Sequence, residues 1–417
     1  MKLRSEEGEL VESLRARSET LVSRAIDWCS IASGSRDLEG LGRQLAALET
    51  AFGYLPGTVE RVALEPSKDI DADGRPLERT HPDALRVTVR PEASVQVALT
   101  GHYDTVYGPQ SPFRSVRTRD DGALNGPGIA DMKGGLSIML GALEAFEGWA
   151  GSEAVGYRVL LSPDEEVGSP ASAPLLAELA RGAHIGLTYE PALGDAGTLA
   201  SARKGSGNFA VAVRGRAAHA GRDFAAGRNA LSAAARLAGA LDAMNGWMNG
   251  VTVNVAQIEG GGPLNVVPAS AVVRFNVRSA DASGSRWAKE RIDEAVAALV
   301  EEDGITAALH GGFTRPPKPV NAAQRALFDG VRAAGADLDV ALDWAPSGGV
   351  CEGNNLFAAG LPNLDTLGVR GGAIHSEEEF AWPDSFAERS ALSALVLARI
   401  ASGAIDARAI HDLMETV

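Results

Sequence analysis

The order of apolar and polar positions predicts strands that alternate with helices in the first half of the chain. Apolar runs of strand length occupy residues 95–100, 157–161 and 185–189, and segments with helical spacing lie between them. Polar residues follow each run at once. Strands that alternate with helices predict a mostly parallel sheet with helices on both faces.

The same pattern extends toward both ends of the chain. The segment from Glu9 to Phe52 has helical spacing, whereas the charged, turn-rich segment 67–82 predicts a loop. Further elements are expected as strands at 59–64 and 85–89, a helix ending near 149, a helix at 170–181 and, late in the chain, a helix at 322–334, strands at 338–344 and 363–369, and a helix at 385–402.

Between residues 207 and 314 the pattern changes to strand–helix–strand–strand–helix–strand, which is the order of a ferredoxin-like domain. We therefore expect an α/β fold with a mixed, mostly parallel sheet flanked by helices, and an inserted ferredoxin-like α+β domain. The predicted domains are residues 1–206 with 315–417, and the insertion 207–314. Within the insertion we expect strands at 208–214, 251–258, 271–278 and 305–310 and helices at 223–244 and 285–302.

The charge of the chain restricts its partners. Lys and Arg total 39 and Asp and Glu total 54, so the net charge is −15, which argues against a nucleic-acid partner. The N-terminal residues lack the apolar stretch of a signal peptide, and no apolar run is long enough to span a bilayer. Two cysteines, Cys29 and Cys351, are too few for a disulfide framework. We expect a soluble, cytoplasmic protein that does not bind membranes.

Candidate chemistry begins where the first apolar run ends. His102 and Asp104 are two residues apart, so on an extended chain their side chains point the same way. His102 can bind a metal ion, and we interpret Asp104 as the acid that orients the imidazole of His102. Asp131 precedes a glycine pair and an apolar helical run, so the positive end of that helix favours its carboxylate.

Three more segments end in residues of the metal-ligand type. Glu165-Glu166, Glu190 and His375 each follow a predicted strand, and ligands gather beyond the carboxyl ends of strands in α/β sheets. Two imidazoles and three carboxylates suit a pair of zinc ions, although cobalt or manganese could take their place. Because neighbouring side chains on an extended segment point opposite ways, one of the two adjacent glutamates is available as a general base. The five predicted ligands are His102, Asp131, Glu166, Glu190 and His375.

These residues lie in runs that resemble the zinc-dependent exopeptidases and deacylases, a family that includes glutamate carboxypeptidase, aminoacylase, acetylornithine deacetylase and succinyl-diaminopimelate desuccinylase. The runs occur in the family's order and span most of the chain, and the glutamate carboxypeptidase branch is the most similar in appearance. They are Gly-His102-Tyr-Asp104-Thr-Val, Gly-Ile-Ala-Asp131-Met-Lys-Gly-Gly, Asp164-Glu165-Glu166-Val-Gly-Ser, Tyr-Glu190-Pro, Gly-Arg-Ala-Ala-His219-Ala-Gly, Asn265-Val-Val-Pro and Ile-His375-Ser-Glu.

The resemblance implies a role for each residue. Asp131 would bridge the two ions and Glu165 would be the base. His102 and Glu190 would complete one ion site, with Asp104 orienting His102, and Glu166 and His375 would complete the other. The inserted domain would act as a lid and join a homodimer, with His219 stabilising the oxyanion, in dimeric members from the partner subunit. Arg278 and Asn265 would hold the carboxylate or backbone of a small-molecule substrate.

The implied function is hydrolysis of an amide or peptide bond in a small N-acyl amino acid or peptide. A metal-dependent dipeptidase or a carbamoyl-amide hydrolase on the same scaffold is the alternative. A catalytically inactive binding module would be expected to lack Glu165 or a ligand, and all are present. One difference concerns Glu352, which stands where the family usually has Asp. This difference bears on the geometry of a late substrate loop and not on the metal ligands.

Overall fold

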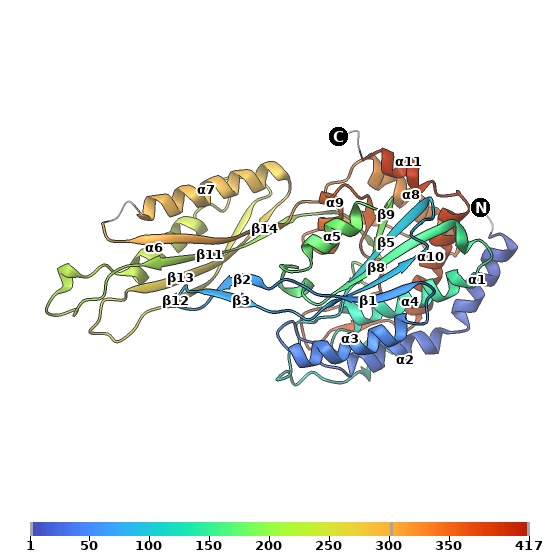
Figure 1. Ribbon diagram of the computed structural model, residues 1–417, viewed down its shortest axis with the longest axis horizontal. Coiled ribbons are helices and arrows are strands. Elements are labelled where there is room, and N and C mark those ends of the chain that lie inside the picture. Colours follow the sequence, from blue (N-terminus) through green and yellow to red (C-terminus); the bar gives the residue numbers. More distant parts are fainter. Residues whose placement is uncertain (1–2, 301–302, 415–417) are drawn as a thin grey trace. The chain divides into compact units, whose positions relative to one another are not determined.

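The computed structural model describes residues 3–300 and 303–414 (Figure 1). The chain divides into two compact units, each with its own hydrophobic core. No helix within the described ranges has both the length and the apolar character that crossing a membrane requires. The first unit comprises Met1–Glu65, His81–Ala202 and Pro319–Val417, and the second comprises Pro66–Thr80 and Arg203–Lys318.

The first unit is built on a six-stranded sheet with the order β1-β4-β8-β5-β9-β16. The pairs β8/β5, β5/β9 and β9/β16 are parallel, whereas β1/β4 and β4/β8 are antiparallel. The predicted mixed, mostly parallel sheet is therefore confirmed. The strands are β1 (Thr58–Val62), β4 (Ala84–Val89), β5 (Val95–His102), β8 (Val155–Ser162), β9 (Ile185–Thr188) and β16 (Asn363–Leu364).

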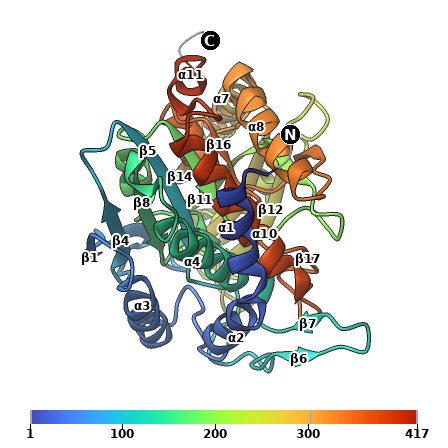
Figure 2. The ribbon, with the colours of Figure 1, turned by 90° about the vertical axis from the view of Figure 1, so that its right-hand side faces the viewer.

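Helices cover both faces of this sheet. Alternate strand residues point to opposite sides, and apolar residues on both sides pack against helices. Leu99 faces the large core, to which α4 and α10 contribute, while Ala98 faces a smaller cluster with residues of α5 and α9. Figure 2 shows α1, α4 and α10 next to one another beside the sheet. The helices are α1 (Ser5–Arg15), α2 (Ser18–Cys29), α3 (Leu38–Phe52), α4 (Gly134–Glu147), α5 (Ala173–Ala180), α8 (Ala322–Asp337), α9 (Glu352–Ala358), α10 (Asp384–Ala401) and α11 (Ala407–Asp412).

Small elements complete the first unit. A small four-stranded sheet has the order β17-β18-β7-β6. Two of its strands precede Asp131 in the chain, and the other two flank His375. Its strands are β6 (Arg117–Thr118), β7 (Leu124–Asn125), β17 (Gly371–Gly372) and β18 (Phe380–Ala381), and a further two-stranded sheet pairs β10 (Leu199–Arg203) with β15 (Trp344–Ser347).

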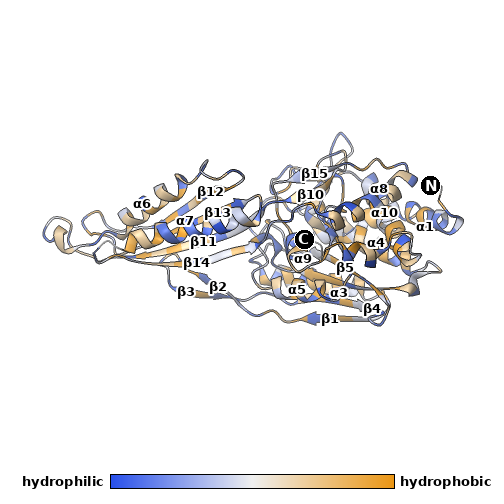
Figure 3. Cartoon of the chain, turned by 90° about the horizontal axis from the view of Figure 1, so that it is seen from above, coloured by the Kyte–Doolittle hydropathy of each residue, from blue (hydrophilic) through white to orange (hydrophobic). Residues whose placement is uncertain are grey.

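The second unit contains an antiparallel sheet with the order β12-β13-β11-β14 and two helices. In chain order the elements read βαββαβ, so the ferredoxin-like arrangement is confirmed. Hydrophobic residues run along the strands, as the colouring of β11 in Figure 3 shows, and one face packs against the helices. The elements are β11 (Gly205–Arg214), α6 (Ala230–Asp242), β12 (Thr252–Gly260), β13 (Ser270–Ser279), α7 (Ala282–Val300) and β14 (Thr306–Arg315); the predicted end of α7 at residue 302 lies outside the described residues.

The loop predicted at 67–82 is wrong, because the segment forms a hairpin of β2 (Ser67–Ile70) and β3 (Pro76–Arg79) that belongs to the second unit. The Asp71 carboxylate accepts the backbone N–H groups of residues 73 and 75 and closes the turn. Ile70 is buried among Ala210, Ala212 and Val272. A single buried apolar residue among many charges does not produce the alternation that identifies a strand.

Two late strand predictions also need correction. The strand predicted at 338–344 is wrong: α8 continues to Asp337, and the chain then turns at Asp339, whose φ of 60° is left-handed. Leu338 and Leu342 are buried, so their apolar character reflects packing of a turn. The strand predicted at 363–369 is reduced to Asn363–Leu364, which pairs with β9.

Candidate metal centre and active site

Three neighbouring parallel strands bring candidate ligands to one edge of the main sheet. His102 is the last residue of β5, Glu165 and Glu166 follow β8, and Glu190 follows β9 by two residues. Because β8, β5 and β9 are adjacent and parallel, their carboxyl ends meet at the same edge. This is where α/β folds place their ligands.

Glycines allow Asp131 to approach this edge. A Cβ on Gly135, in the first turn of α4, would lie 2.0 Å from the carbonyl oxygen of Tyr189, so only glycine lets the helix come so near the end of β9. Gly128 has a φ of 72°, a conformation that glycine adopts without strain. The sequence around Asp131 is thus suited to a tight turn beside Glu190.

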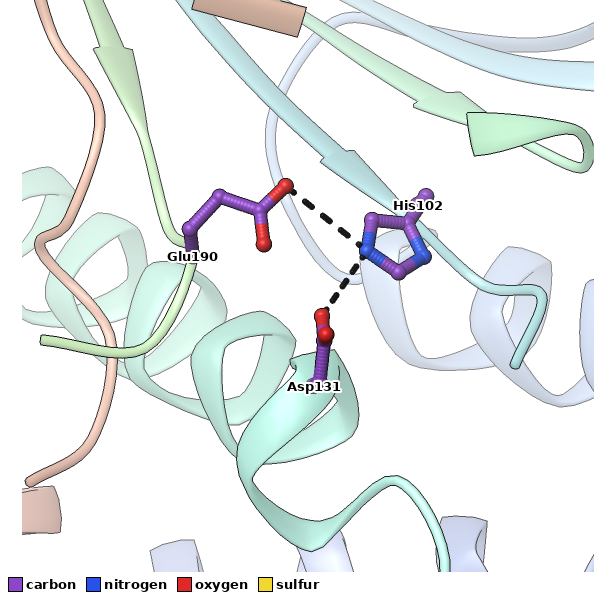
Figure 4. A group of neighbouring side chains, drawn as sticks. All are labelled: His102, Asp131 and Glu190. Carbon is purple, nitrogen blue, oxygen red and sulfur yellow. Dashed lines mark hydrogen bonds and ion pairs between the residues drawn. The ribbon is translucent and has the colours of Figure 1, made fainter. Parts of the chain in front are cut away.

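The side chains form two triads that share Asp131. In the first, His102 Nε2 lies 3.1 Å from Asp131 Oδ1 and 3.7 Å from Glu190 Oε1 (Figure 4). In the second, His375 Nε2 lies 3.1 Å from Glu166 Oε2 and 3.3 Å from Asp131 Oδ2. In each triad one potential ligand atom per residue lies within 4.8 Å of the others. Within the described residues these are the two groups of His, Cys, Asp and Glu with a geometry that could hold a metal ion.

The environment of the triads suits cations. Buried oxygens of Glu166 and Glu190 (Oε1 in both) have no hydrogen-bond partner among the described residues. Burial, and then the charge of Asp131, raises the pKa of Glu166 to about 8 and that of Glu190 to about 7. A bound cation would stabilise carboxylates that converge and that cannot easily all ionise without it. Imidazole together with carboxylate is a donor set that zinc accepts.

The histidines pair with these carboxylates. Burial alone would lower the pKa of His102, but contacts with the carboxylates of Asp104, Asp131 and Glu190 raise it well above its usual value. Hydrogen bonds to Asp131 and Glu166 raise the pKa of His375 to about 10. Each imidazole therefore holds a proton where a bound cation would compete with it, so metal binding is expected to release protons.

Asp104 supports more of the site than the sequence predicted. Its Oδ1 lies 3.3 Å from His102 Nδ1, in agreement with the expected orienting contact. The same carboxylate also accepts the backbone N–H groups of Glu165 at 3.1 Å and Glu166 at 3.2 Å, and the hydroxyl of Ser35 at 2.7 Å. One buried acid thus connects the candidate ligand His102 with the turn that carries the candidate base. Glu165 itself is largely buried, with 9% of its surface exposed.

Residues that the sequence analysis missed also surround the triads. Ser35 lies at a break between helices, and nothing in its neighbourhood marks it as a partner of Asp104. Glu379 is fully buried, although it ends an acidic run whose other members, Glu377 and Glu378, are exposed. The feature of the sequence that could have pointed to Glu379 is its position just after the motif that contains His375.

The structure places Glu352 in a helix and not in a loop. It is the first residue of α9, it is fully buried, and its carboxylate accepts a hydrogen bond from Ser162 at the end of β8. Cys351 is the N-cap of the same helix and is also buried. The extra methylene of Glu relative to Asp is therefore accommodated inside the first unit.

The remaining predicted residues lie in the second unit. His219 and Asn265 are exposed and sit on adjacent segments, since the backbone N–H of Ala220 donates to the carbonyl of Asn265. Nδ1 of His219 accepts the backbone N–H groups of Gly221 and Arg222, so the proton of the neutral ring is on Nε2. Arg278 is half-buried on β13, and its Nε donates to Asn276.

Comparison with known proteins agrees with these features. The sequence model of peptidase family M20/M25/M40 matches residues 98–399. Carboxypeptidase G2 of Pseudomonas sp. (strain RS-16) is 28% identical over 359 residues, which cover 84% of this chain and 81% of that protein. Succinyl-diaminopimelate desuccinylase of Bordetella petrii is 30% identical over 311 residues, covering 70% of this chain and 79% of that protein.

Solved structures show the same fold. Human carnosine dipeptidase 1 is 16% identical, with a TM-score of 0.70 over 96% of this chain and 99% of that one. A metallo-carboxypeptidase from Sulfolobus solfataricus is also 16% identical, with a TM-score of 0.69 over 90% of this chain and 98% of that one. At these identities the likeness supports the fold alone. Together with the match of the family model, it confirms the resemblance predicted from the motifs: the chain belongs to peptidase family M20/M25/M40, whose members are metallopeptidases and amidohydrolases that act on carbon–nitrogen bonds.

Proposed function

We propose that this protein binds two zinc ions and hydrolyses the amide or peptide bond of a small N-acyl amino acid or peptide. The observation that carries the proposal is the pair of triads that share Asp131. His102 and Glu190 would hold one ion with Asp131, and Glu166 and His375 would hold the other. A carboxylate common to both groups would hold two ions close together, as in a dinuclear centre.

In this proposal each residue has a separate role in the reaction. Bound zinc would polarise the substrate carbonyl and lower the pKa of a water molecule. Glu165 takes a proton from the attacking water and passes it to the leaving amine as the carbon–nitrogen bond breaks. Asp104 holds the backbone of Glu165 in place through the hydrogen bond to its N–H. The base is thus positioned by a buried acid that also contacts His102.

The second unit supplies the proposed substrate contacts. His219 would donate from Nε2 to the carbonyl oxygen as negative charge develops there, and its Nδ1 contacts favour the tautomer that can do so. Arg278 and Asn265 would bind the substrate carboxylate or backbone. We further propose that the unit joins a homodimer in which His219 serves the partner's site, and that the enzyme works in the cytoplasm.

The relatives indicate the type of bond that the proposed enzyme would cleave. The names of the two sequence relatives describe a carboxypeptidase and a desuccinylase, and both activities cleave a bond between an acyl group and an amine. A panel of N-acyl amino acids and dipeptides with acidic, basic and apolar ends would separate the deacylase, carboxypeptidase and dipeptidase forms of the proposal.

The test is metal content together with turnover. Purified protein should carry close to two zinc equivalents by emission spectrometry, lose activity on this panel after chelation, and regain it with zinc. Full activity of metal-free protein would reject the proposal.

A further inference from the structure

Glu379 is a fully buried carboxylate four residues after His375. Its Oε1 accepts the backbone N–H groups of Ala130 at 2.9 Å and Asp131 at 3.0 Å, and its Oε2 accepts that of Gly128 at 3.1 Å. Three N–H groups of one turn therefore converge on a single side chain. The turn is the one that carries Asp131, so Glu379 fixes the backbone of the residue shared by both triads.

The backbone of Glu379 belongs to the loop that carries His375. Its N–H donates to the carbonyl of Ser376 at 3.1 Å, and its carbonyl accepts the side-chain amide of Asn125 at 2.7 Å. The next residue, Phe380, pairs with Asn125 as β18 joins β7. Figure 2 shows β6, β7 and β17 of the same small sheet near one another. Glu379 thus lies at the point where the His375 loop returns to the sheet.

The His375 loop depends on such contacts because burial does little to hold it. The side chain of His375 is 53% exposed, and its φ of 62° is left-handed, which is costly for a residue other than glycine. The hydroxyl of Tyr107 donates to the carbonyl of Ser376 at 2.7 Å, and the amide of Asn125 donates to that of Glu377 at 3.0 Å. Hydrogen bonds from the side chains of Tyr107 and Asn125 to the main chain of this loop therefore help to hold His375 in place.

We propose that Glu379 is a positioning residue that fixes Asp131 and His375 relative to each other and thereby sets the affinity for one of the two metal ions. The inference rests on the proposed dinuclear function. The side chain of Glu379 holds the turn that carries Asp131, and its main chain is part of the loop that carries His375. Asp131 and His375 belong to the same triad, which Glu166 completes. The other triad takes His102 and Glu190 from the ends of β5 and β9, so it depends on Glu379 only through Asp131.

A carboxylate is needed here because both of its oxygens accept from N–H groups. In Glu379→Gln the side-chain amide has one oxygen and one NH2 group. The NH2 group must face the N–H of Gly128 or those of Ala130 and Asp131, and two donors cannot form a hydrogen bond with each other. The variant keeps the size of the side chain and loses one arm of the contact. Loss of such supporting contacts typically lowers metal affinity by about 10- to 100-fold.

The experiment is a titration of metal-free protein with Co²⁺, followed by its visible absorption and by competition with a chromophoric chelator. Wild type should bind two equivalents in separable steps. Glu379→Gln should weaken one step by about 10- to 100-fold. The other step depends on Glu379 through Asp131 alone and should weaken by a smaller factor. Zinc added in excess should restore the kcat of the variant, with KM close to the wild-type value, because the substrate contacts are untouched.

Glu378→Gln is the matched control, since it makes the same chemical change at the exposed neighbouring position and should leave both steps unaltered. If Glu379→Gln does not fold, Asn125→Ala tests the same loop, because it removes two amide contacts to that segment, and it should weaken the same single step. Unchanged affinities, or equal weakening of both steps, would overturn the inference while the two equivalents bound by wild type uphold the dinuclear proposal. A wild type that does not bind two equivalents would instead reject the proposed function.

Discussion

Replacement of Asp104 by Asn should weaken metal binding at both proposed sites, because this one carboxylate supports candidate ligands of both triads. It lies 3.3 Å from His102 Nδ1 and accepts the backbone N–H groups of Glu165 and Glu166. His102 belongs to the first triad and Glu166 to the second. The effect should therefore differ from that of Glu379→Gln, which is expected to act mainly on one site.

The size of the effect can be estimated from the contacts of Asp104. The side chain is fully buried, and its two oxygens accept from different backbone N–H groups. Asn keeps one oxygen, so at least one N–H of the turn loses its acceptor and faces the NH2 group. A hydrogen bond to a charged group contributes about 1.5–3 kcal/mol, and each 1.4 kcal/mol is tenfold. Each binding step should therefore weaken by about 10- to 100-fold.

The assay is the same Co²⁺ titration, with circular dichroism to verify the fold. Asp120→Asn, an exposed position in the first unit, makes the same change in charge and should bind metal as wild type does. If Asp104→Asn bound both equivalents with wild-type affinity, the contacts of Asp104 would not support the ligands. Weakening of only one step would show that Asp104 acts on one triad alone.

Three further expectations concern the base, the dimer and the cysteines. Glu165→Gln should keep its metal but lose at least about 100-fold in kcat, and turnover near the wild-type rate would refute Glu165 as the base. If His219 acts across a dimer, inactive His219→Ala and Glu165→Gln chains refolded together should recover partial activity; proven heterodimers without activity would contradict this. Cys29 and Cys351 are both 1% exposed, and burial raises the pKa of Cys29 to about 12, so the native protein should resist thiol reagents that label both after denaturation. Rapid labelling of native protein would be inconsistent with this burial.

The predicted ligands were accessible from the sequence because three of them follow strands with clear apolar runs. His102, Glu166 and Glu190 come after β5, β8 and β9, and adjacent parallel strands bring their ends together. Asp131 was recognisable from the glycines that start α4. The structure places these four residues together with His375, the fifth predicted ligand, in two triads. His375 lies in a loop, and the strand predicted before it is shorter than expected.

The contacts that support the ligands were not predictable because they depend on long-range backbone geometry. Glu379 stands in a run of three glutamates, and only the fold distinguishes the buried one from the exposed ones. Ser35 lies 69 residues before its partner Asp104. The hairpin of β2 and β3 escaped detection because charged pairs such as Arg79–Asp69 and Arg274–Asp69 hold it, with Ile70 as its buried residue. Periodicity reports burial of apolar faces and is insensitive to such polar contacts.

The most direct test of the dinuclear centre is a crystal structure of the zinc-loaded protein with anomalous diffraction data collected above and below the zinc absorption edge. We expect two peaks, one among His102, Asp131 and Glu190 and one among Asp131, Glu166 and His375. A single peak, or zinc bound away from Asp131 in crystals of active enzyme, would contradict the assignment of two ions that share one carboxylate.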